Sequence, residues 1–331
     1  MRILFFCFSL FITTLVQSQI TLDTASCIRN NSSILSIAVS VKDSLVYTRL
    51  FNQTKSDALL NNQSLTKSVE TILIGIAIDK GFIRSLDEPI VDFFPELKND
   101  PDNRKSHITI SDIMNQASGL WHENLERLDS YLNLNDPSDY TLQQPLVSQP
   151  GSILHYNNAA SHLLSVIITK ATKETTLDFA RKNLFKPLEI KESAWPIMKD
   201  GYCDGSGLLS VRLRTIDMNK IGQLLLNGGR YNGKQIVSQK RVQSLLTTEK
   251  TYPAPWGLTN TQYGLCFYRR TYEHETIIYG MGWGGQFLVL IPKLKAVVSI
   301  NQVVDDRTAI QQSNTFMEQI FPLILNWIKT K

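Results

Sequence analysis

Cysteine is scarce in this sequence, and long runs of one charge are missing. Of the four cysteines, Cys7 lies in the first apolar segment. The other three, Cys27, Cys203 and Cys266, form no Cys-x-x-Cys pair, so neither a disulfide framework nor a zinc site is indicated. One bridge with one free thiol and three buried thiols both remain open. The net charge of +4, without a basic run interleaved with aromatics, predicts no nucleic-acid partner.

Three other patterns are also missing, and each absence excludes a class of protein. The five histidines show no His-Glu-x-x-His or similar spacing, so we predict no metal and no cofactor. No Gly-x-Ser-x-Gly motif is visible, which disfavours a Ser-His-Asp triad. No second long apolar run follows the N-terminal one, so no membrane span is predicted.

The first residues have the pattern of an export signal. Met1-Arg2 is a basic tip, residues 3–16 form a short apolar core, and Val16-Gln17-Ser18 offers small residues for cleavage. Cys7 lies inside the apolar core, which argues against a lipid-anchored cysteine. We therefore predict a signal peptide over residues 1–18 and a secreted or periplasmic mature protein without a membrane anchor.

The mature part, residues 19–331, is predicted to form a single α/β (α+β) domain. Strands of an antiparallel sheet are indicated at 34–41, 45–51, 262–268, 276–279, 286–291 and 296–300. Helices are indicated at 64–81, 109–114, 159–172, 177–185, 215–246 and 309–331. The order predicts an α/β lobe, about 19–62 and 205–331, flanked by terminal helices, and an inserted all-helical lobe, about 63–204. The site is expected between the lobes.

The helix that starts at Ser64 carries the first chemical signal. From Leu65 onward the run is largely apolar, contains no Pro and closes at Gly81, so it predicts a buried helix with a glycine stop. Residues three apart share a helix face, so the Lys67 ammonium can reach the Ser64 hydroxyl at a helix N-terminus that favours negative charge. The alternative is an ordinary cap followed by a solvated lysine, but an unpaired lysine at the mouth of a buried helix is costly. We interpret Ser64 as an activated serine.

Two later motifs extend this pattern. Tyr156-Asn157-Asn158 stands directly before the helix predicted at 159–172. Gly280-Met281-Gly282-Trp283-Gly284-Gly285 is a glycine-rich bend against an apolar strand, where a backbone can approach a ligand closely. Each motif alone is weak, but their order and separation are informative together.

With these motifs, the sequence resembles the serine hydrolases of the class C β-lactamase and penicillin-binding protein type. That family includes β-lactamases, D-amino-acid peptidases, secreted esterases and hydrolases of 6-aminohexanoate oligomers. The resemblance runs from about residue 34 to the C-terminus, through segments 64–68, 108–121, 222–229 and 282–286. It implies a β-lactamase/transpeptidase-like fold and a small-molecule or short-peptide substrate.

The resemblance also implies roles for individual residues. Ser64 would be the nucleophile that forms an acyl-enzyme, Lys67 its hydrogen-bonded partner, and Tyr156 the general base that later protonates the leaving group. Asn158 would steady the lysine and the substrate amide. The oxyanion hole would consist of the backbone N–H groups of Ser64 and Trp283, with Gly282 and its neighbours making the close approach possible.

One departure from the family pattern affects the expected substrate. The third motif normally begins with Lys or His, where this chain has Gly280, and the cation helps many relatives hold a substrate carboxylate. Uncharged or cationic acyl substrates are therefore favoured, as in the esterase and oligomer-hydrolase branch. A β-lactamase, a D,D-peptidase or D-aminopeptidase, and a non-catalytic relative that binds peptidoglycan fragments remain alternatives.

The walls of the cleft are predicted at 121–149 and 251–261. Trp121 is expected to contact substrate, and His122 and Glu123 either line the pocket or form an ordinary loop cluster. His155 is interpreted as a packing or capping residue, and His162 as a satisfied core residue. Cys203 is interpreted as a structural thiol.

Overall fold

The computed structural model describes Leu22 and residues 25–123, 128–247, 250–254 and 260–331. The predicted signal peptide, residues 1–18, lies outside the described residues, as do residues 255–259 of the second predicted wall. Within the described part the largest unit is an eight-stranded sheet in the order β2-β1-β12-β11-β10-β9-β8-β7. Its strands are β1 (Ile34–Val41), β2 (Ser44–Leu50), β7 (Tyr252–Pro253), β8 (Thr261–Gly264), β9 (Phe267–Tyr272), β10 (Glu275–Gly282), β11 (Gln286–Ile291) and β12 (Ala296–Gln302).

The sheet joins the two ends of the described chain. The predicted hairpin is confirmed: β1 and β2 are antiparallel, and the turn residues Lys42 and Asp43 both have positive φ, which matches the twist of paired strands. On its other side β1 pairs with β12, with Ser36 opposite Asn301. All the neighbouring strands of this sheet whose pairing is given are antiparallel, so the predicted fold class is confirmed.

Side chains alternate between two buried layers, as the two-residue repeat of a strand requires. On β11, Phe287 and Val289 pack with the C-terminal helices, and the Phe287 ring stacks on Phe316 with centroids 4.4 Å apart. Leu288 and Leu290 lie in the other cluster, with the helices that follow the N-terminal hairpin. Both faces of the sheet are therefore covered.

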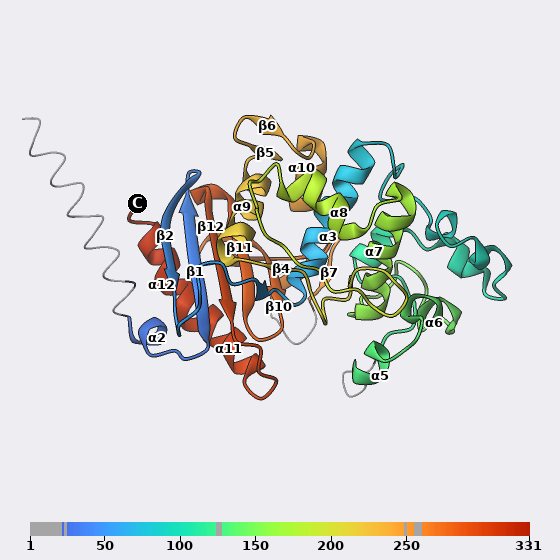
Figure 1. Ribbon diagram of the computed structural model, residues 1–331, viewed down its shortest axis with the longest axis horizontal. Helices are drawn as coiled ribbons and strands as arrows, with labels where there is room; N and C mark the ends of the chain where they lie inside the picture. The colour runs from blue at the N-terminus through green and yellow to red at the C-terminus, as the bar shows by residue number, and fades with distance from the viewer. Residues whose placement is uncertain (1–21, 23–24, 124–127, 248–249, 255–259) are drawn as a thin grey trace, which may run out of the picture.

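The helices divide between the sheet faces and a separate helical region (Figure 1). The terminal segment comprises α11 (Ala309–Thr315), a π-helical turn (Phe316–Ile320) and α12 (Phe321–Ile328), and the opposite face carries α9 (Thr215–Leu226). The remaining α-helices are α2 (Ser26–Arg29), α3 (Leu65–Asp79), α4 (Ile110–Met114), α5 (Leu128–Leu132), α6 (Pro137–Gln143), α7 (Asn158–Thr172), α8 (Thr176–Ala180) and α10 (Gln239–Thr247). Figure 1 places α3 between the sheet and the helical region that contains α6, α7 and α8.

Three predictions of local structure were wrong. The run 262–268 is not one strand, because Leu265 and Cys266 adopt positive φ and turn the chain between β8 and β9. The helical block predicted over 215–246 is interrupted after α9 by a short hairpin of β5 (Arg230–Tyr231) and β6 (Lys234–Gln235). The wall 121–149, predicted as a polar loop region, contains the helices α5 and α6.

A short two-stranded ladder fixes the start of α3. β3 (Leu60–Asn61) pairs with β4 (Arg212–Leu213), and Thr66 Oγ1 donates to the Gln63 carbonyl while accepting from the Val211 N–H at 3.0 Å. Every residue of α3 from Leu65 to Ile78 is buried. The N-terminus of α3 is therefore held by two backbone segments, one that precedes the helical region in the chain and one that follows it.

Candidate active site

The side chain of Lys67 connects the segments that meet at the start of α3. Its Nζ donates to Ser64 Oγ at 3.1 Å, to Asn158 Oδ1 at 2.8 Å and to the Ser206 carbonyl. An ammonium has three N–H donors, so all three are used. Lys67 is 1% exposed, and no carboxylate of the described residues lies within ion-pair distance of its Nζ. The lysine is thus satisfied by uncharged oxygens alone.

Ser64 presents its hydroxyl rather than using it as a cap. It stands at the N-cap position of α3, yet its side chain makes no capping hydrogen bond. It is partly exposed, whereas Leu65 and Lys67 behind it are buried. A hydroxyl that is accessible from outside and hydrogen-bonded to an ammonium from inside has the arrangement of a nucleophile.

Tyr156 lies beside this pair. Lys67 Nζ is 5.1 Å from the centroid of the Tyr156 ring, within the range of a cation–π contact. On its other side the ring meets Tyr263 edge-on, with centroids 6.5 Å apart. The structure therefore brings together Ser64, Lys67, Tyr156 and Asn158, as the sequence predicts.

The turn that carries Tyr156 and Asn158 is held by the first turn of α7. Asn157 caps α7 by accepting from the Ala160 N–H at 2.7 Å, and its amide donates to the Leu120 and Trp121 carbonyls. Gln116, which has positive φ, accepts from the Asn157 N–H at 2.6 Å through its side chain. These bonds tie the turn to the segment that follows α4.

Glu123 has a structural role at the same place. Its carboxylate is buried and accepts from the N–H groups of Asn158 at 3.1 Å and of Ala159 at 3.0 Å. A carboxylate is stabilised at a helix N-terminus by these donors and by the helix dipole. Glu123 therefore supports Asn158, which in turn holds Lys67.

A cavity of about 360 Å³ opens beside this turn. Trp121 forms part of its wall, and the indole meets the Tyr140 ring edge-on with centroids 5.2 Å apart. The other lining residues are His122, Glu123, Ser130, Tyr131 and Leu134. Trp121 is thus placed where it can contact a molecule bound near Asn158.

The third motif lies at the end of β10, against α3. A Cβ added to Gly280 would come within 2.7 Å of Leu65 Cδ2, and one added to Gly282 within 2.6 Å of the Asn62 carbonyl. Glycine at these positions lets the strand pack directly on the start of the helix. Trp283 follows with its side chain 43% exposed, and its indole N–H donates to Asp306 at 2.7 Å. The Trp283 backbone is therefore near the start of α3, while its ring is held by the loop before α11.

The remaining histidines and cysteines have structural surroundings. His162 is buried, with Nε2 2.8 Å from Asp200 and Nδ1 accepting from the Gly205 N–H, so the interpretation as a satisfied core residue is confirmed. His155 stacks on His122 with centroids 5.7 Å apart. The described cysteines are free thiols. Burial raises the pKa of both Cys203 and Cys266 to about 11, which makes either a poor nucleophile.

Sequence reasoning missed Ser206, which belongs to this site, and Glu70, which lies behind it. Ser206 contributes only its carbonyl, and a backbone acceptor leaves no mark in a side-chain motif. The Gly205-Ser206-Gly207 run was the available signal, because Gly207 has positive φ and packs against Ser64. Glu70 was visible as one charge in an apolar helix.

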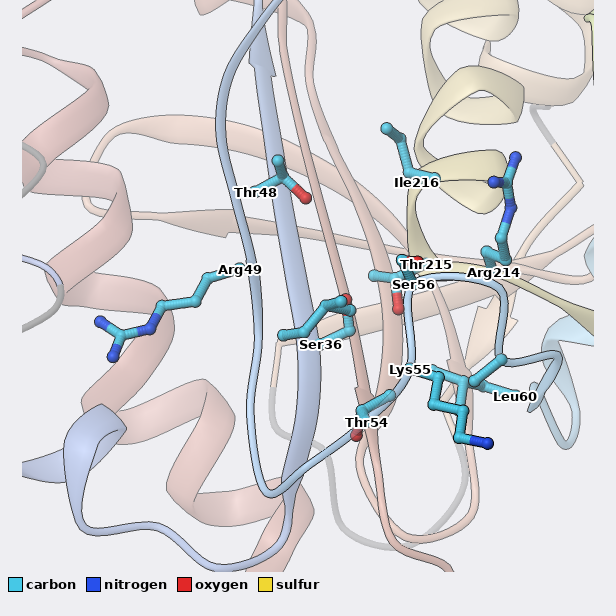
Figure 2. Close-up of a pocket in the computed structure, with 12 residues that line it drawn as sticks. Ser36, Thr48, Arg49, Thr54, Lys55, Ser56, Leu60, Arg214, Thr215 and Ile216 are labelled. Carbon is cyan, nitrogen blue, oxygen red and sulfur yellow. The ribbon is translucent and has the colours of Figure 1, made fainter.

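A second cavity, of about 500 Å³, lies between the β1–β2 hairpin, the loop after it and the start of α9. None of the predicted site residues lines it. Figure 2 shows that the cationic side chains of Arg49, Lys55 and Arg214 point in three different directions. They therefore do not form one anion-binding cluster.

In the described ranges, no group of three or more His, Cys, Asp or Glu residues is arranged to hold a metal ion. Across those ranges, no helix combines the length and apolar character needed to cross a membrane.

Comparison with known proteins gave one family and a set of similar folds. The family model described as Beta-lactamase matches residues 31–309. "Beta-lactamase-like protein 4" of Dictyostelium discoideum is 25% identical over 146 residues, which are 40% of this chain and 26% of that protein. The chain thus matches about a quarter of the length of that curated relative.

Solved structures share the fold at low sequence identity. "Putative 6-aminohexanoate-dimer hydrolase from Bacillus anthracis" has a TM-score of 0.74 at 21% identity, covering 91% of this chain and 82% of that one. A D-amino acid amidase from Ochrobactrum anthropi SV3 has a TM-score of 0.71 at 18% identity, covering 96% and 99%. A penicillin-binding protein homologue from Pyrococcus abyssi has a TM-score of 0.68 at 17% identity, covering 95% and 76%.

Proposed function

Because this chain belongs to the Beta-lactamase family, we propose that it is a serine hydrolase that cleaves ester or amide bonds through an acyl-enzyme on Ser64. The observation that carries the proposal is the hydrogen bond between Lys67 Nζ and Ser64 Oγ, 3.1 Å long, at the N-terminus of a buried helix. The N-terminal pattern at residues 1–18 adds the proposal that the mature enzyme is exported.

The reaction starts with removal of the Ser64 proton. In this proposal Lys67 is an ammonium that donates to Ser64, Asn158 and Ser206, and it is not the base. Tyr156 is then the base, because its phenolate is stabilised by the ammonium 5.1 Å from its ring centroid. Ser64 Oγ attacks the carbonyl carbon and the proton passes to Tyr156, which returns it to the leaving alcohol or amine. Water then attacks the carbonyl carbon of the acyl-enzyme and gives a proton to Tyr156. Tyr156 passes this proton to Ser64 Oγ as the bond to the acyl group breaks, and the acid is released.

Two backbone N–H groups are proposed to stabilise the negative charge on the carbonyl oxygen. One belongs to Ser64 at the start of α3, where the helix dipole also favours an anion. The other belongs to Trp283, directly after the Gly282 that packs on the Asn62 carbonyl. This arrangement acts on the transition state of either ester or amide cleavage.

The substrate is proposed to be an uncharged or cationic acyl compound. Gly280 faces Leu65 and Ser68 of α3 and provides no cation for a substrate carboxylate. The aromatic wall with Trp121 and Tyr140 favours apolar groups.

A fluorophosphonate probe tests the reaction directly. The mature chain is incubated with the probe and the adduct is mapped by mass spectrometry, with Ser64→Ala as the matched control. We expect one adduct on Ser64 and none in the variant. Equal labelling of the variant, or no adduct on Ser64, would contradict the proposal.

The choice of substrate is tested by comparing two chromogenic compounds. We expect faster turnover of a short-chain p-nitrophenyl ester than of a chromogenic cephalosporin. Faster cephalosporin turnover would instead show that the preferred activity of the chain is β-lactam hydrolysis.

A further inference from the structure

Glu70 is a carboxyl group buried directly behind the site. It is 0% exposed and lies one helical turn beyond Lys67, on the same side of α3. Neither of its carboxyl oxygens has a hydrogen-bond partner among the described residues. A fully buried acid without partners is costly, so its presence requires an explanation.

The carboxyl occupies space left by a glycine. A Cβ added to Gly205 would lie 2.5 Å from Glu70 Oε1 and 2.9 Å from His162 Cα. Gly205 directly precedes Ser206, whose carbonyl accepts from Lys67. Glu70 therefore packs against the segment that holds Lys67, on the side away from solvent.

Titratable groups from four segments surround Glu70, and the described contacts give none of them a hydrogen bond to it. They are Lys67 on α3, His162 on α7, Cys203 and Asp204 before β4, and Cys266 between β8 and β9. Asp204 already accepts from the N–H groups of Ser206, Leu209 and Ser210 and from the Ser206 hydroxyl. His162 is occupied by Asp200 and by the Gly205 N–H.

These surroundings favour the neutral form of the acid. Burial raises the pKa of Glu70 well above its usual value, and the negative charge of Asp204 raises it further. Lys67 acts in the opposite direction but does not offset the other two effects. These effects together favour the uncharged acid and shift the loss of its proton toward higher pH.

We propose that Glu70 is a positioning residue that acts through Lys67. While Glu70 is uncharged, the positive charge of the Lys67 ammonium acts on Ser64 and Tyr156 alone. When Glu70 ionises, its negative charge offsets part of that effect. This inference rests on the proposed function. A carboxylate at Glu70 would attract the Lys67 ammonium from behind and weaken its stabilisation of the Tyr156 phenolate. Glu70 then sets the alkaline limit of activity, without touching the substrate.

The test is the pH dependence of probe labelling. The rate constant for fluorophosphonate labelling of Ser64 is measured on the full mature chain between about pH 6 and about pH 10, a range that extends well above the usual pKa of a glutamate. The variant is Glu70→Gln, which keeps the shape and removes the ionisation. The matched control is Glu275→Gln at the start of β10, because Glu275 is also buried and also has an oxygen without a partner.

At neutral pH we expect Glu70→Gln to label within about twofold of the unaltered chain, since a neutral acid and an amide have similar fields. At the alkaline end we expect it to label about tenfold faster, because no carboxylate forms behind Lys67. Glu275→Gln should follow the unaltered chain throughout. Should Glu70→Gln fail to fold, Glu70→Met removes the same ionisation at similar length.

An alkaline limit that is unchanged in Glu70→Gln would overturn the inference, as would an equal shift in Glu275→Gln. A uniform change in rate at every pH would indicate a structural role only and would also overturn it. If the unaltered chain is not labelled at Ser64 at any pH, the proposed function itself fails. Labelling that is independent of Glu70 refutes only this inference.

Discussion

Two lysines in the described residues are almost completely buried, and the protein satisfies them in different ways. Lys105, in the 3-10 turn before α4, is 2% exposed and pairs with Asp100 at 2.7 Å while donating to the Leu142 carbonyl. Lys67 is 1% exposed and donates only to uncharged oxygens. The first lysine has its charge neutralised and the second does not.

The difference distinguishes a structural charge from a chemical one. A buried ion pair repays part of its desolvation cost through the opposite charge, as at Lys105. Lys67 has no opposite charge beside it, so its electric field acts on Ser64, Tyr156 and a developing oxyanion. The uncharged form of Glu70 behind it agrees with the same principle. Substitutions at either lysine, or at its partners, test this difference.

The largest effect is expected from Lys67→Met. Loss of the ammonium removes the partner of Ser64 and the stabilisation of the Tyr156 phenolate, so the labelling rate should fall about a thousandfold. The free energy of unfolding, measured in urea, should stay equal or rise, because an unpaired buried charge is removed. A variant that unfolds at lower urea and still labels would reverse the roles of the two lysines.

Tyr156→Phe tests whether Tyr156, beside the Lys67 ammonium, is the general base. We expect a fall in ester turnover of about a hundredfold, since a general acid/base is lost while the ring remains. Its contact with Tyr263 should preserve the fold, which circular dichroism can check. Near-normal turnover would show that another group takes the Ser64 proton.

Lys105→Met should affect stability rather than rate. It leaves the partly buried Asp100 without its counter-charge, so the free energy of unfolding should fall by about 2 kcal/mol. The folded fraction should label at Ser64 at the normal rate. A loss of labelling that exceeds the loss of folded protein would mean that Lys105 also contributes to the site.

Asn158→Asp gives Lys67 the kind of partner that Lys105 has. The new carboxylate would accept at the position of Asn158 Oδ1, now 2.8 Å from Nζ, and neutralise the lysine. We expect the labelling rate to fall about tenfold with little change in stability. Asn158→Gln serves as the uncharged control. An unimpaired Asn158→Asp would show that the free charge of Lys67 is not needed.

The side chains of the site were predictable, and the backbone carbonyl of Ser206 was not. Ser64, Lys67, Tyr156 and Asn158 belong to motifs that the family resemblance contains, and the structure brings all four together. The Ser206 carbonyl is invisible to such reasoning, because any residue supplies a carbonyl. The role of Glu123 as a cap of α7 depends on a fold that places residue 123 next to residue 158.

Turns account for two of the three errors in the fold. The strand break at Leu265 and Cys266 was missed because neither residue is typical of positive φ. The β5–β6 hairpin did carry a signal, since Asn232-Gly233 is a common two-residue turn. It was overlooked beside the apolar periodicity of its neighbours. Long elements such as α3 and α7 were found because burial repeats over several turns.

The pairing of β1 with β12 constrains the order in which the protein can fold. The edge of β1 that pairs with β12 is covered only after residues as late as Asn301 have been synthesised, because Ser36 lies opposite Asn301. The ribosome adds only about 5–20 residues each second. During that interval the N-terminal hairpin has an open edge, and such non-local closure is slow. The sheet is thus complete only after β12, its last strand in chain order, has been synthesised.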